Sequence, residues 1–305
     1  MEVGRAPLRQ DLRMIGRYLQ MRMTRDPAKR VRRLYEMYPQ SYLMPEHSTY
    51  INYGYWENGC DTLDAASEAL AALLAEAGEF QPDDVILDVG FGYGDQDFLW
   101  LRDKKPRKIY GLNITPQHVR GARLRAAQEG VDDQLDFREG SATAIPFEDG
   151  TFDRVVALES AFHFYTRAQF FKEAFRVLRP GGVLVMADIV PLDGGTARSE
   201  IQAPPLTWVG LCFDQENWYG SDVYTAELGK AGFEQVGIRS IRDKVYDPWR
   251  RYVLGKLDDP GFRRRTGKLY RRALGRMWSN QEQLTHDMDL LDYVVAVARK
   301  PEVRP

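Results

Sequence analysis

A short apolar run that ends in a glycine-rich turn most constrains what this chain can fold into. Residues 83–97 read DDVILDVGFGYGDQD, and Val85, Ile86 and Leu87 have the aliphatic character of a strand buried on both faces of a parallel sheet. The glycines that follow permit a sharp turn and let a ligand approach the bare backbone. Residues 96–101 then predict a helix whose first N–H groups face that ligand.

Several kinds of site use a glycine-rich turn between a strand and a helix. The dinucleotide fingerprint needs G-x-G-x-x-G, but here the glycines fall as G-x-G-x-G and Asp95 stands at the third position. A P-loop needs a Lys-Ser or Lys-Thr pair, which this turn lacks. The pattern D-V-G-x-G-x-G resembles motif I of the class I S-adenosylmethionine (SAM) methyltransferases. A tight turn that binds nothing remains the alternative.

The chain beyond this turn alternates predicted helices and strands, which is the pattern of a doubly wound α/β fold with a mostly parallel, Rossmann-like sheet. Apolar runs predict further strands at 108–112, 135–138, 152–158, 183–187, 233–241 and 293–298. Helical periodicity and capping signals predict helices at 61–78, 116–130, 166–178 and 221–232, and basic helical material at 246–277.

Candidate ligand-binding side chains follow the strands predicted at 108–112 and 135–138. Asn113 lies 25 residues after Asp88, close to the spacing of about 20 at which dinucleotide sites place a ribose-binding carboxylate. Its amide oxygen can accept a hydrogen bond from a ribose hydroxyl but carries no charge, and asparagine is also common in turns that bind no ligand. The loop at 140–147 offers its backbone and Ser141 to an adenine ring, with Ile114 and Ile145 as apolar walls.

A histidine follows the fourth strand, where open α/β sheets bind their ligands. His163 lies in the segment ESAFHF, and an imidazole is a suitable general base because its ordinary pKa is near neutrality. A histidine simply packed between Phe162 and Phe164 is the structural alternative. Glu159 and Asp188 also stand at predicted strand ends and offer a second chemical alternative, a Mg²⁺ site, but no cluster with metal-ligand spacing accompanies them.

The first 59 residues precede the predicted core. Arginines at nine positions between 5 and 33 accompany Leu8, Leu12, Ile15 and Leu19 at helical spacing, which predicts an amphipathic basic helix. We interpret it as a solvated face on a helix that packs on the core or on a sister subunit, and expect no contact with nucleic acid or membrane. The aromatic stretch 50–59 predicts either an anchor for this segment or, through Tyr53, a lid over a cationic cofactor.

Composition places the chain among ordinary globular proteins. It has 305 residues, 44% hydrophobic and 28% charged, and a formal net charge of -2. Its two cysteines form no disulfide framework, no signal peptide is visible, and no apolar run reaches membrane-spanning length. These features predict a cytoplasmic location.

Longer segments extend the resemblance. The ordered set DVGFGYGDQDFLWL, GSATAIPFEDGTFDRVVALES and FFKEAFRVLRPGGVLVMADIV looks like the successive motifs of class I methyltransferases. From Leu34 to the end, YINYGYW, LESAFHF and VYDPWRRYVLGKL resemble the macrolide sugar O-methyltransferases of the erythromycin type. This resemblance implies a seven-stranded sheet whose last strand is antiparallel, with a helical cap.

The resemblance also implies a reaction. SAM would donate a methyl group to a hydroxyl of a glycosylated polyketide or similar small molecule, leaving S-adenosylhomocysteine, with His163 as the general base. The residues it implies around the cofactor are Tyr53, Asp88, Gly90, Gly92, Gly94, Gln96, Asn113, Ile114, Gln117, Ser141, Ala142 and Glu159, and it implies no metal ligand. Many relatives carry an acidic residue at the positions of Asn113 and Ser141, so these two polar contacts depart from the pattern.

Other functions stay open. Methyl transfer to carbon, a SAM-binding cyclase that no longer transfers methyl, and a nicotinamide oxidoreductase all use related folds. We expect an N-terminal helical segment and aromatic lid at 1–59, a cofactor-binding core at 60–190 and a lid insertion at 191–220. A continuation of the core at 221–247, a helical cap at 248–290 and a last strand with its tail at 291–305 would follow. The N-terminal helices are also candidates for contact with a second copy of the chain.

Overall fold

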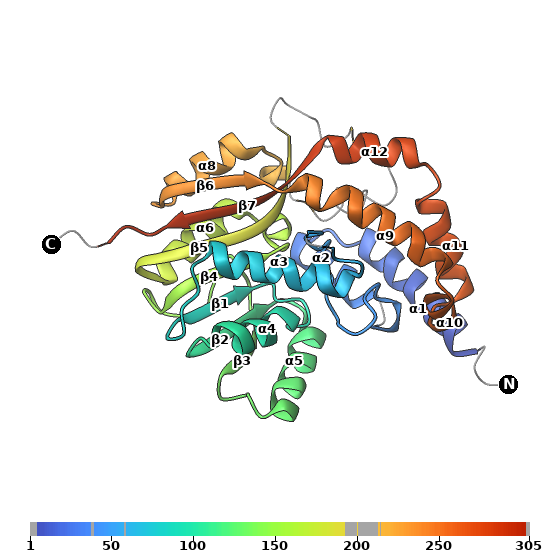
Figure 1. Cartoon of the computed structure of the whole chain (residues 1–305), viewed down its shortest axis with the longest axis horizontal. Coiled ribbons are helices and arrows are strands. Elements are labelled where there is room, and N and C mark those ends of the chain that lie inside the picture. The colour runs from blue at the N-terminus through green and yellow to red at the C-terminus, as the bar shows by residue number, and fades with distance from the viewer. Residues whose placement is uncertain are drawn as a thin grey trace.

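A twisted seven-stranded sheet forms the centre of the protein (Figure 1). The computed structural model describes residues 5–37, 40–57, 59–192, 200, 213 and 215–302. Its strand order is β3-β2-β1-β4-β5-β7-β6. The first five strands pair in parallel, and β7 runs antiparallel to both β5 and β6. The predicted doubly wound sheet with an antiparallel last strand is therefore confirmed.

The strands follow the apolar runs of the sequence. They are β1 (Val85–Val89), β2 (Lys108–Asn113), β3 (Leu135–Glu139), β4 (Phe152–Leu158), β5 (Leu178–Pro191), β6 (Glu234–Ser240) and β7 (Leu291–Arg299). The prediction for β5 was too short at both ends. The strand already begins at Leu178, which pairs with Phe152, and continues past Asp188 to Pro191 beside β7. Asp188 consequently lies inside a strand and not at its end.

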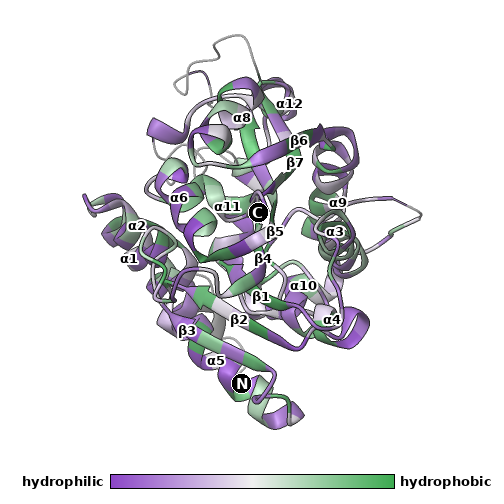
Figure 2. Ribbon diagram, turned by 90° about the vertical axis from the view of Figure 1, so that its left-hand side faces the viewer, coloured by the Kyte–Doolittle hydropathy of each residue, from purple (hydrophilic) through white to green (hydrophobic). Residues whose placement is uncertain are grey.

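Helices cover both faces of the sheet, so the central strands are apolar on both sides. On β1, Ile86 belongs to the apolar cluster beneath α3 (Leu63–Ala77) and α4 (Asp95–Lys104). Its neighbours Val85 and Leu87 belong to the cluster beneath α6 (Arg167–Val177) and α8 (Ser221–Lys230). Figure 2 shows the helices alternating between hydrophilic and hydrophobic residues, as expected for elements with one buried face.

A second group of helices lies beyond one end of the sheet. It combines α1 (Arg5–Arg22) and α2 (Pro27–Met37) from the N-terminus with α9 (Tyr246–Asp258), α10 (Pro260–Arg265), α11 (Lys268–Met277) and α12 (Gln281–Asp289), which gather on the right of Figure 1. The helix α5 (Pro116–Glu129) and short 3-10 turns at η1 (Gln40–Tyr42), η2 (Ala161–His163), η4 (Gln215–Asn217) and η5 (Arg242–Lys244) complete the described elements.

The two terminal regions are tied together by one buried carboxylate. Asp11 of α1 accepts hydrogen bonds from the Tyr42 hydroxyl at 2.8 Å and from the backbone N–H groups of Leu269 and Tyr270 at 3.0 and 3.4 Å. It thus satisfies free donors at the start of α11. Most of the predicted lid insertion at 191–220 lies outside the described residues.

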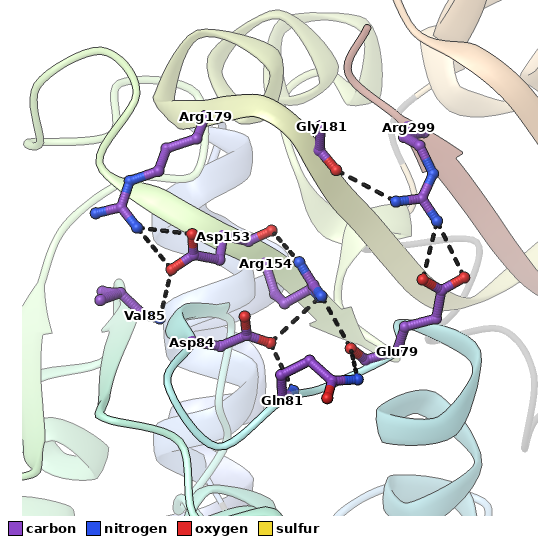
Figure 3. A network of polar contacts seen from close by, with 9 residues as sticks. All are labelled: Glu79, Gln81, Asp84, Val85, Asp153, Arg154, Arg179, Gly181 and Arg299. Carbon is purple, nitrogen blue, oxygen red and sulfur yellow. Dashed lines mark hydrogen bonds and ion pairs between the residues drawn. The ribbon is translucent and has the colours of Figure 1, made fainter. Parts of the chain in front are cut away.

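A network of charged side chains closes the edge of the sheet at which β1 and β4 begin (Figure 3). Asp153 accepts from Arg179 at 2.6 and 2.7 Å and from the backbone N–H of Val85 at 2.8 Å. Arg154 pairs with Asp84 at 3.4 Å and donates to the carbonyl of Glu79, whose carboxylate binds Arg299. These bonds join four strands, β1, β4, β5 and β7, and the segment that follows α3.

Candidate functional site

A cavity lies at the opposite edge of the sheet, where β1, β2 and β4 end. Loops after these strands form its floor, and α2 together with residues 49–52 covers it. Nine of the residues predicted at the site line this cavity: Gly90, Gly92, Gln96, Asn113, Ile114, Ser141, Ala142, Glu159 and His163. Convergence of strand ends explains why residues far apart in sequence meet here.

The glycine loop adopts a backbone that other residues resist. Gly90, Gly92 and Gly94 have φ angles of 86°, 58° and 91°. A Cβ on Gly90 would lie 2.5 Å from the Cβ of Ser160, so this glycine is required by packing as well as by its φ angle. Gly92 faces the cavity, and a Cβ there would meet only Ile51, at 3.4 Å.

Two buried carboxyls lie beneath the loop. Gln96 donates from Nε2 to Asp88 at 2.8 Å and to the carbonyl of Phe91 at 3.0 Å. Burial raises the pKa of Asp88, and burial together with the neighbouring Asp88 charge raises the pKa of Asp97 well above its usual range. Asp88 is fully buried and does not line the cavity, so its contact with the loop passes through Gln96.

Asn113 plays a local role that is visible in the backbone. Its Oδ1 accepts from the N–H of Thr115 at 2.9 Å, and its Nδ2 donates to the carbonyl of Gly92 at 3.5 Å. The side chain therefore joins the end of β2 to the glycine loop and shapes the turn into α5. It also lines the cavity, and an amide oxygen has a second lone pair available for a ligand.

The first turn of α5 presents His118 to the cavity and turns Gln117 outward. Gln117 is exposed and absent from the lining, whereas His118 is 2% exposed. The His118 Nε2 is buried with no hydrogen-bond partner, and burial lowers the pKa of the imidazole to about 4. The ring also hydrogen-bonds the backbone of Gly92, so only Nε2 lacks a partner, and that atom is a candidate ligand contact.

His163 meets a residue that the sequence did not single out. It ends η2, is 8% exposed, and its Nε2 shares a hydrogen bond of 2.8 Å with the hydroxyl of Tyr35. The two rings meet edge to face with centroids 5.5 Å apart. Tyr35 comes from α2, which also contributes Ala28 and Val31 to the cavity wall. The N-terminal helix pair thus closes over the predicted base.

Glu159 connects the cavity to the aromatic cluster behind it. The residue has a φ of 50°, and its carboxylate accepts from the backbone N–H of Tyr53 at 2.8 Å and from the Tyr293 hydroxyl at 3.2 Å. Desolvation raises the pKa of Glu159 to about 8, despite these two bonds. The ring of Tyr53 stacks on Trp249 with centroids 4.1 Å apart, which is the arrangement of an anchor.

Asp188, one of the two carboxylates suggested for a Mg²⁺ site, is engaged in a buried ion pair with Arg167. Asp188 accepts from Arg167 at 2.9 Å, from the Tyr224 hydroxyl at 3.0 Å and from the backbone N–H of Phe162 at 3.1 Å, and both charged side chains are fully buried. Within the described ranges, no group of three or more His, Cys, Asp or Glu side chains converges as a metal site. Nor is any helix there long and apolar enough to cross a bilayer.

Two carboxylates, Asp64 and Asp95, hold the segment 46–49, which leads into the cover of the cavity. Asp64 accepts three backbone N–H groups of this segment, from Glu46, His47 and Ser48. Asp95 accepts from the backbone and hydroxyl of Thr49 and pairs with Arg125 at 2.9 Å. Asp95, the residue that stands where a dinucleotide site has its third glycine, therefore fixes the cover onto α4.

Four predicted site residues lie outside the cavity lining: Tyr53, Asp88, Gly94 and Gln117. Their contact with a cofactor stays a prediction. Sequence reasoning missed Tyr35 and His118, both of which line the cavity, and in the aromatic stretch 50–59 it named Tyr53, whereas Tyr50 and Ile51 are the lining residues. His118 could have been predicted from helical periodicity, because it lies four residues before Ala122 on the buried face of α5.

Comparison with known proteins assigns this arrangement to a family. A family described as "Methyltransferase domain" matches residues 87–186. The erythromycin 3''-O-methyltransferase of Saccharopolyspora erythraea is 42% identical over 279 residues, which cover 90% of this chain and 91% of that protein.

Solved structures share the fold at lower identity. The (4+2)-cyclase SpnF has a TM-score of 0.65 at 23% identity, covering 83% of this chain and 88% of its own. The geranyl diphosphate C-methyltransferase of Streptomyces coelicolor A3(2), solved with S-adenosylhomocysteine, has a TM-score of 0.70 at 15% identity, covering 91% and 99%. The chain therefore belongs to the SAM-dependent methyltransferases and, by its long match to the erythromycin enzyme, to their O-methyltransferases.

Proposed function

We propose that this enzyme methylates a sugar hydroxyl of a glycosylated polyketide, with His163 as the base that receives the hydroxyl proton. The observation that carries the proposal is the place of His163. Its imidazole lines the cavity just beyond β4 and is held there by Tyr35. The 42% identity to an enzyme whose name specifies 3''-O-methylation of erythromycin supports the acceptor class.

The residues of the cavity fit the cofactor of this family. Gly92 leaves the backbone bare at the wall, and the buried His118 Nε2 needs a hydrogen-bond partner. Asn113 and His118 would meet the ribose, and Ser141, Ala142 and Ile114 would surround the adenine. When bound, SAM supplies an electrophilic sulfonium methyl group.

The protein's own work is alignment and proton removal. With SAM bound in this cavity, the acceptor oxygen would be aligned with the sulfonium methyl group, whose transfer would release S-adenosylhomocysteine, and His163 would receive the hydroxyl proton. Tyr35 acts as a positioning residue, because its hydrogen bond fixes the orientation of the imidazole. Glu159, four residues before His163, would face the same acceptor as a neutral carboxyl group.

The test is the substitution His163→Ala in the purified enzyme. We expect kcat to fall by about 10²–10⁴-fold, the usual contribution of a positioned base, with SAM affinity little changed. Tyr35→Phe should lower kcat less, because it loosens the imidazole without removing it. Initial rates with demethylated macrolide glycosides and calorimetry with SAM measure both quantities.

Two outcomes would contradict the proposal. A folded His163→Ala enzyme with near wild-type kcat would exclude the base. A product whose mass shows no added methyl group would indicate a cyclase, the activity named for one structural neighbour at 23% identity. Product fragmentation separates transfer to oxygen from transfer to carbon.

A further inference from the structure

The outer face of α1 exposes an apolar stripe. Leu12, Ile15, Leu19 and Met23 are 57%, 46%, 54% and 75% exposed. The spacing of three and four residues places Leu12, Ile15 and Leu19 along one side of α1, and Met23 follows in the turn directly after the helix. With Tyr18, they make up five of the ten large hydrophobic side chains exposed in the described part of the chain. Scattered exposed hydrophobic residues are ordinary, but such a concentration marks a contact surface.

The orientation of α1 is fixed, so the helix cannot roll to bury this stripe. Asp11 on the other face is 1% exposed and holds the start of α11 through its bonds to Leu269 and Tyr270. Met14 and Met21 pack inward from the same face. The apolar stripe therefore points away from the protein's own core.

Charge indicates what the stripe can receive. Residues 5–37 contain ten arginine and lysine side chains and three carboxylates, a formal charge of +7. The whole chain carries -2, so the remaining residues carry -9. On α1, Arg9, Arg13, Arg17 and Arg22 are exposed, whereas its one carboxylate, Asp11, is buried. A complementary surface must be acidic. Residues 246–277, which include α11 beside α1, carry a further +7, so the acidic part of this same chain is the remainder, which carries -16.

We propose that the stripe is the contact surface for a second copy of this chain, whose acidic part receives the basic helix. In a two-fold dimer each copy gives and receives one helix. An 18-residue helix is about 27 Å long, and Leu269 of the neighbouring α11, 36% exposed, widens the patch toward the roughly 800 Å² per partner that a stable interface needs. Because α1 packs on α2, the contact would also brace the helix that carries Tyr35.

Sedimentation equilibrium of the full-length enzyme tests the proposal. We expect a wild-type dimer at micromolar concentration, weakened by rising salt because oppositely charged surfaces meet. Leu19→Glu should raise the dimer dissociation constant by at least about tenfold, since it places a charge in the apolar contact. Leu124→Glu is the matched control, because Leu124 is 61% exposed on α5, far from the stripe, and should leave the dimer unchanged.

Several results would overturn the proposal. They are a monomeric wild type, a dimer that Leu19→Glu leaves intact, and a dimer that Leu124→Glu disrupts equally. Binding to anionic phosphatidylserine vesicles by a monomeric wild type would assign the stripe to a membrane surface instead. Far-UV circular dichroism confirms that each variant is folded. The outcome is independent of His163, so it does not depend on the proposed reaction.

Discussion

The two edges of the central sheet use polar groups in opposite ways. At the edge where β1 and β4 begin, Asp153 and Arg179 bond each other, and Arg154, whose buried Nε has no hydrogen-bond partner, has Asp84 as its ion-pair partner at 3.4 Å (Figure 3). At the other edge, Tyr50 Oη and His118 Nε2 are buried without a hydrogen-bond partner, and three glycines hold positive φ angles. Buried polar groups without partners are costly, so they persist where a ligand completes them.

The contrast separates residues that hold the fold from residues that serve the reaction. Substitutions at the closed edge should lower stability and leave cofactor affinity unchanged. Substitutions at the open edge should do the reverse. Substitutions of Gly92, Asp153 and His118 test that division, and Glu159 is the exception, because it lines the cavity yet should affect stability through its raised pKa.

The largest effect should come from Gly92→Val at the open edge. A side chain there occupies the cavity, and the φ angle of 58° strains any residue with a Cβ. We expect SAM affinity to fall at least about 100-fold, roughly 2.7 kcal/mol, by calorimetry. Gly130→Val is the control, because Gly130 has a φ of 69° with open space around it and lies outside the cavity lining. Unchanged SAM affinity in folded Gly92→Val would move the cofactor elsewhere.

The closed edge should respond in stability alone. Asp153→Ala leaves the N–H of Val85 and the guanidinium of Arg179 without their acceptor, which we expect to cost about 1–3 kcal/mol in urea unfolding. Asp149→Ala removes a 79% exposed partner of Arg176 and should cost at most about 1 kcal/mol. Loss of SAM affinity in folded Asp153→Ala would break the division between the edges.

Glu159 should make stability depend on pH. Because burial raises its pKa from 4.5 to about 8, the folded protein binds this proton more tightly than the unfolded chain between those values. Its contribution is therefore present at low pH and lost as pH rises through about 8, with a slope of at most about 1.4 kcal/mol per pH unit. The Glu159→Gln variant should lack this slope, so the difference in unfolding free energy between wild type and variant should change with pH by that amount. An unchanged slope would mean that the carboxyl group is charged in the fold.

The smallest effect should separate two neighbours on α5. His118→Leu removes the buried Nε2 and should weaken SAM binding by about 0.5–1.5 kcal/mol, the net value of one neutral hydrogen bond. Gln117→Leu, on the outer face, should leave affinity unchanged. Calorimetry on both variants decides the matter, and the opposite pattern would favour the sequence-based choice of Gln117.

Most of the sheet could be predicted because each strand is a distinct apolar run. The start of β5 could not, because Arg179 to Gly182 read as a turn, and their strand conformation depends on pairing with β4 and β7. The helix α12 lies within the predicted helical cap at 248–290, but its own bounds could not be predicted, since its sequence QEQLTHDMD has little apolar periodicity and begins after an Asn280 side-chain cap. The start of β5 depends on long-range strand pairing, and the start of α12 depends on a local side-chain cap.

The site was predictable where it follows strand ends and hidden where distant segments meet. Gly90 directly follows β1, Asn113 is the last residue of β2, and His163 lies in the turn after β4. Tyr35 lies 128 residues before the histidine that it contacts, so no spacing rule links the two. The N-terminal helices close over the cavity through tertiary contacts, which are the bond of Tyr35 to His163 and the packing of α1 against α11.

The bond between Asp11 and Leu269 also sets an order of events during synthesis. The two residues are 258 positions apart, so α1 leaves the ribosome long before its anchor exists. At about 5–20 residues per second, that interval is roughly 13–50 seconds. The glycine loop, its strands and the bonds of Asp64 and Asp95 to residues 46–49 can form during this time, but the bond that ties α1 to α11 cannot. The helix that packs against α2 and its Tyr35 is therefore anchored only near the end of translation.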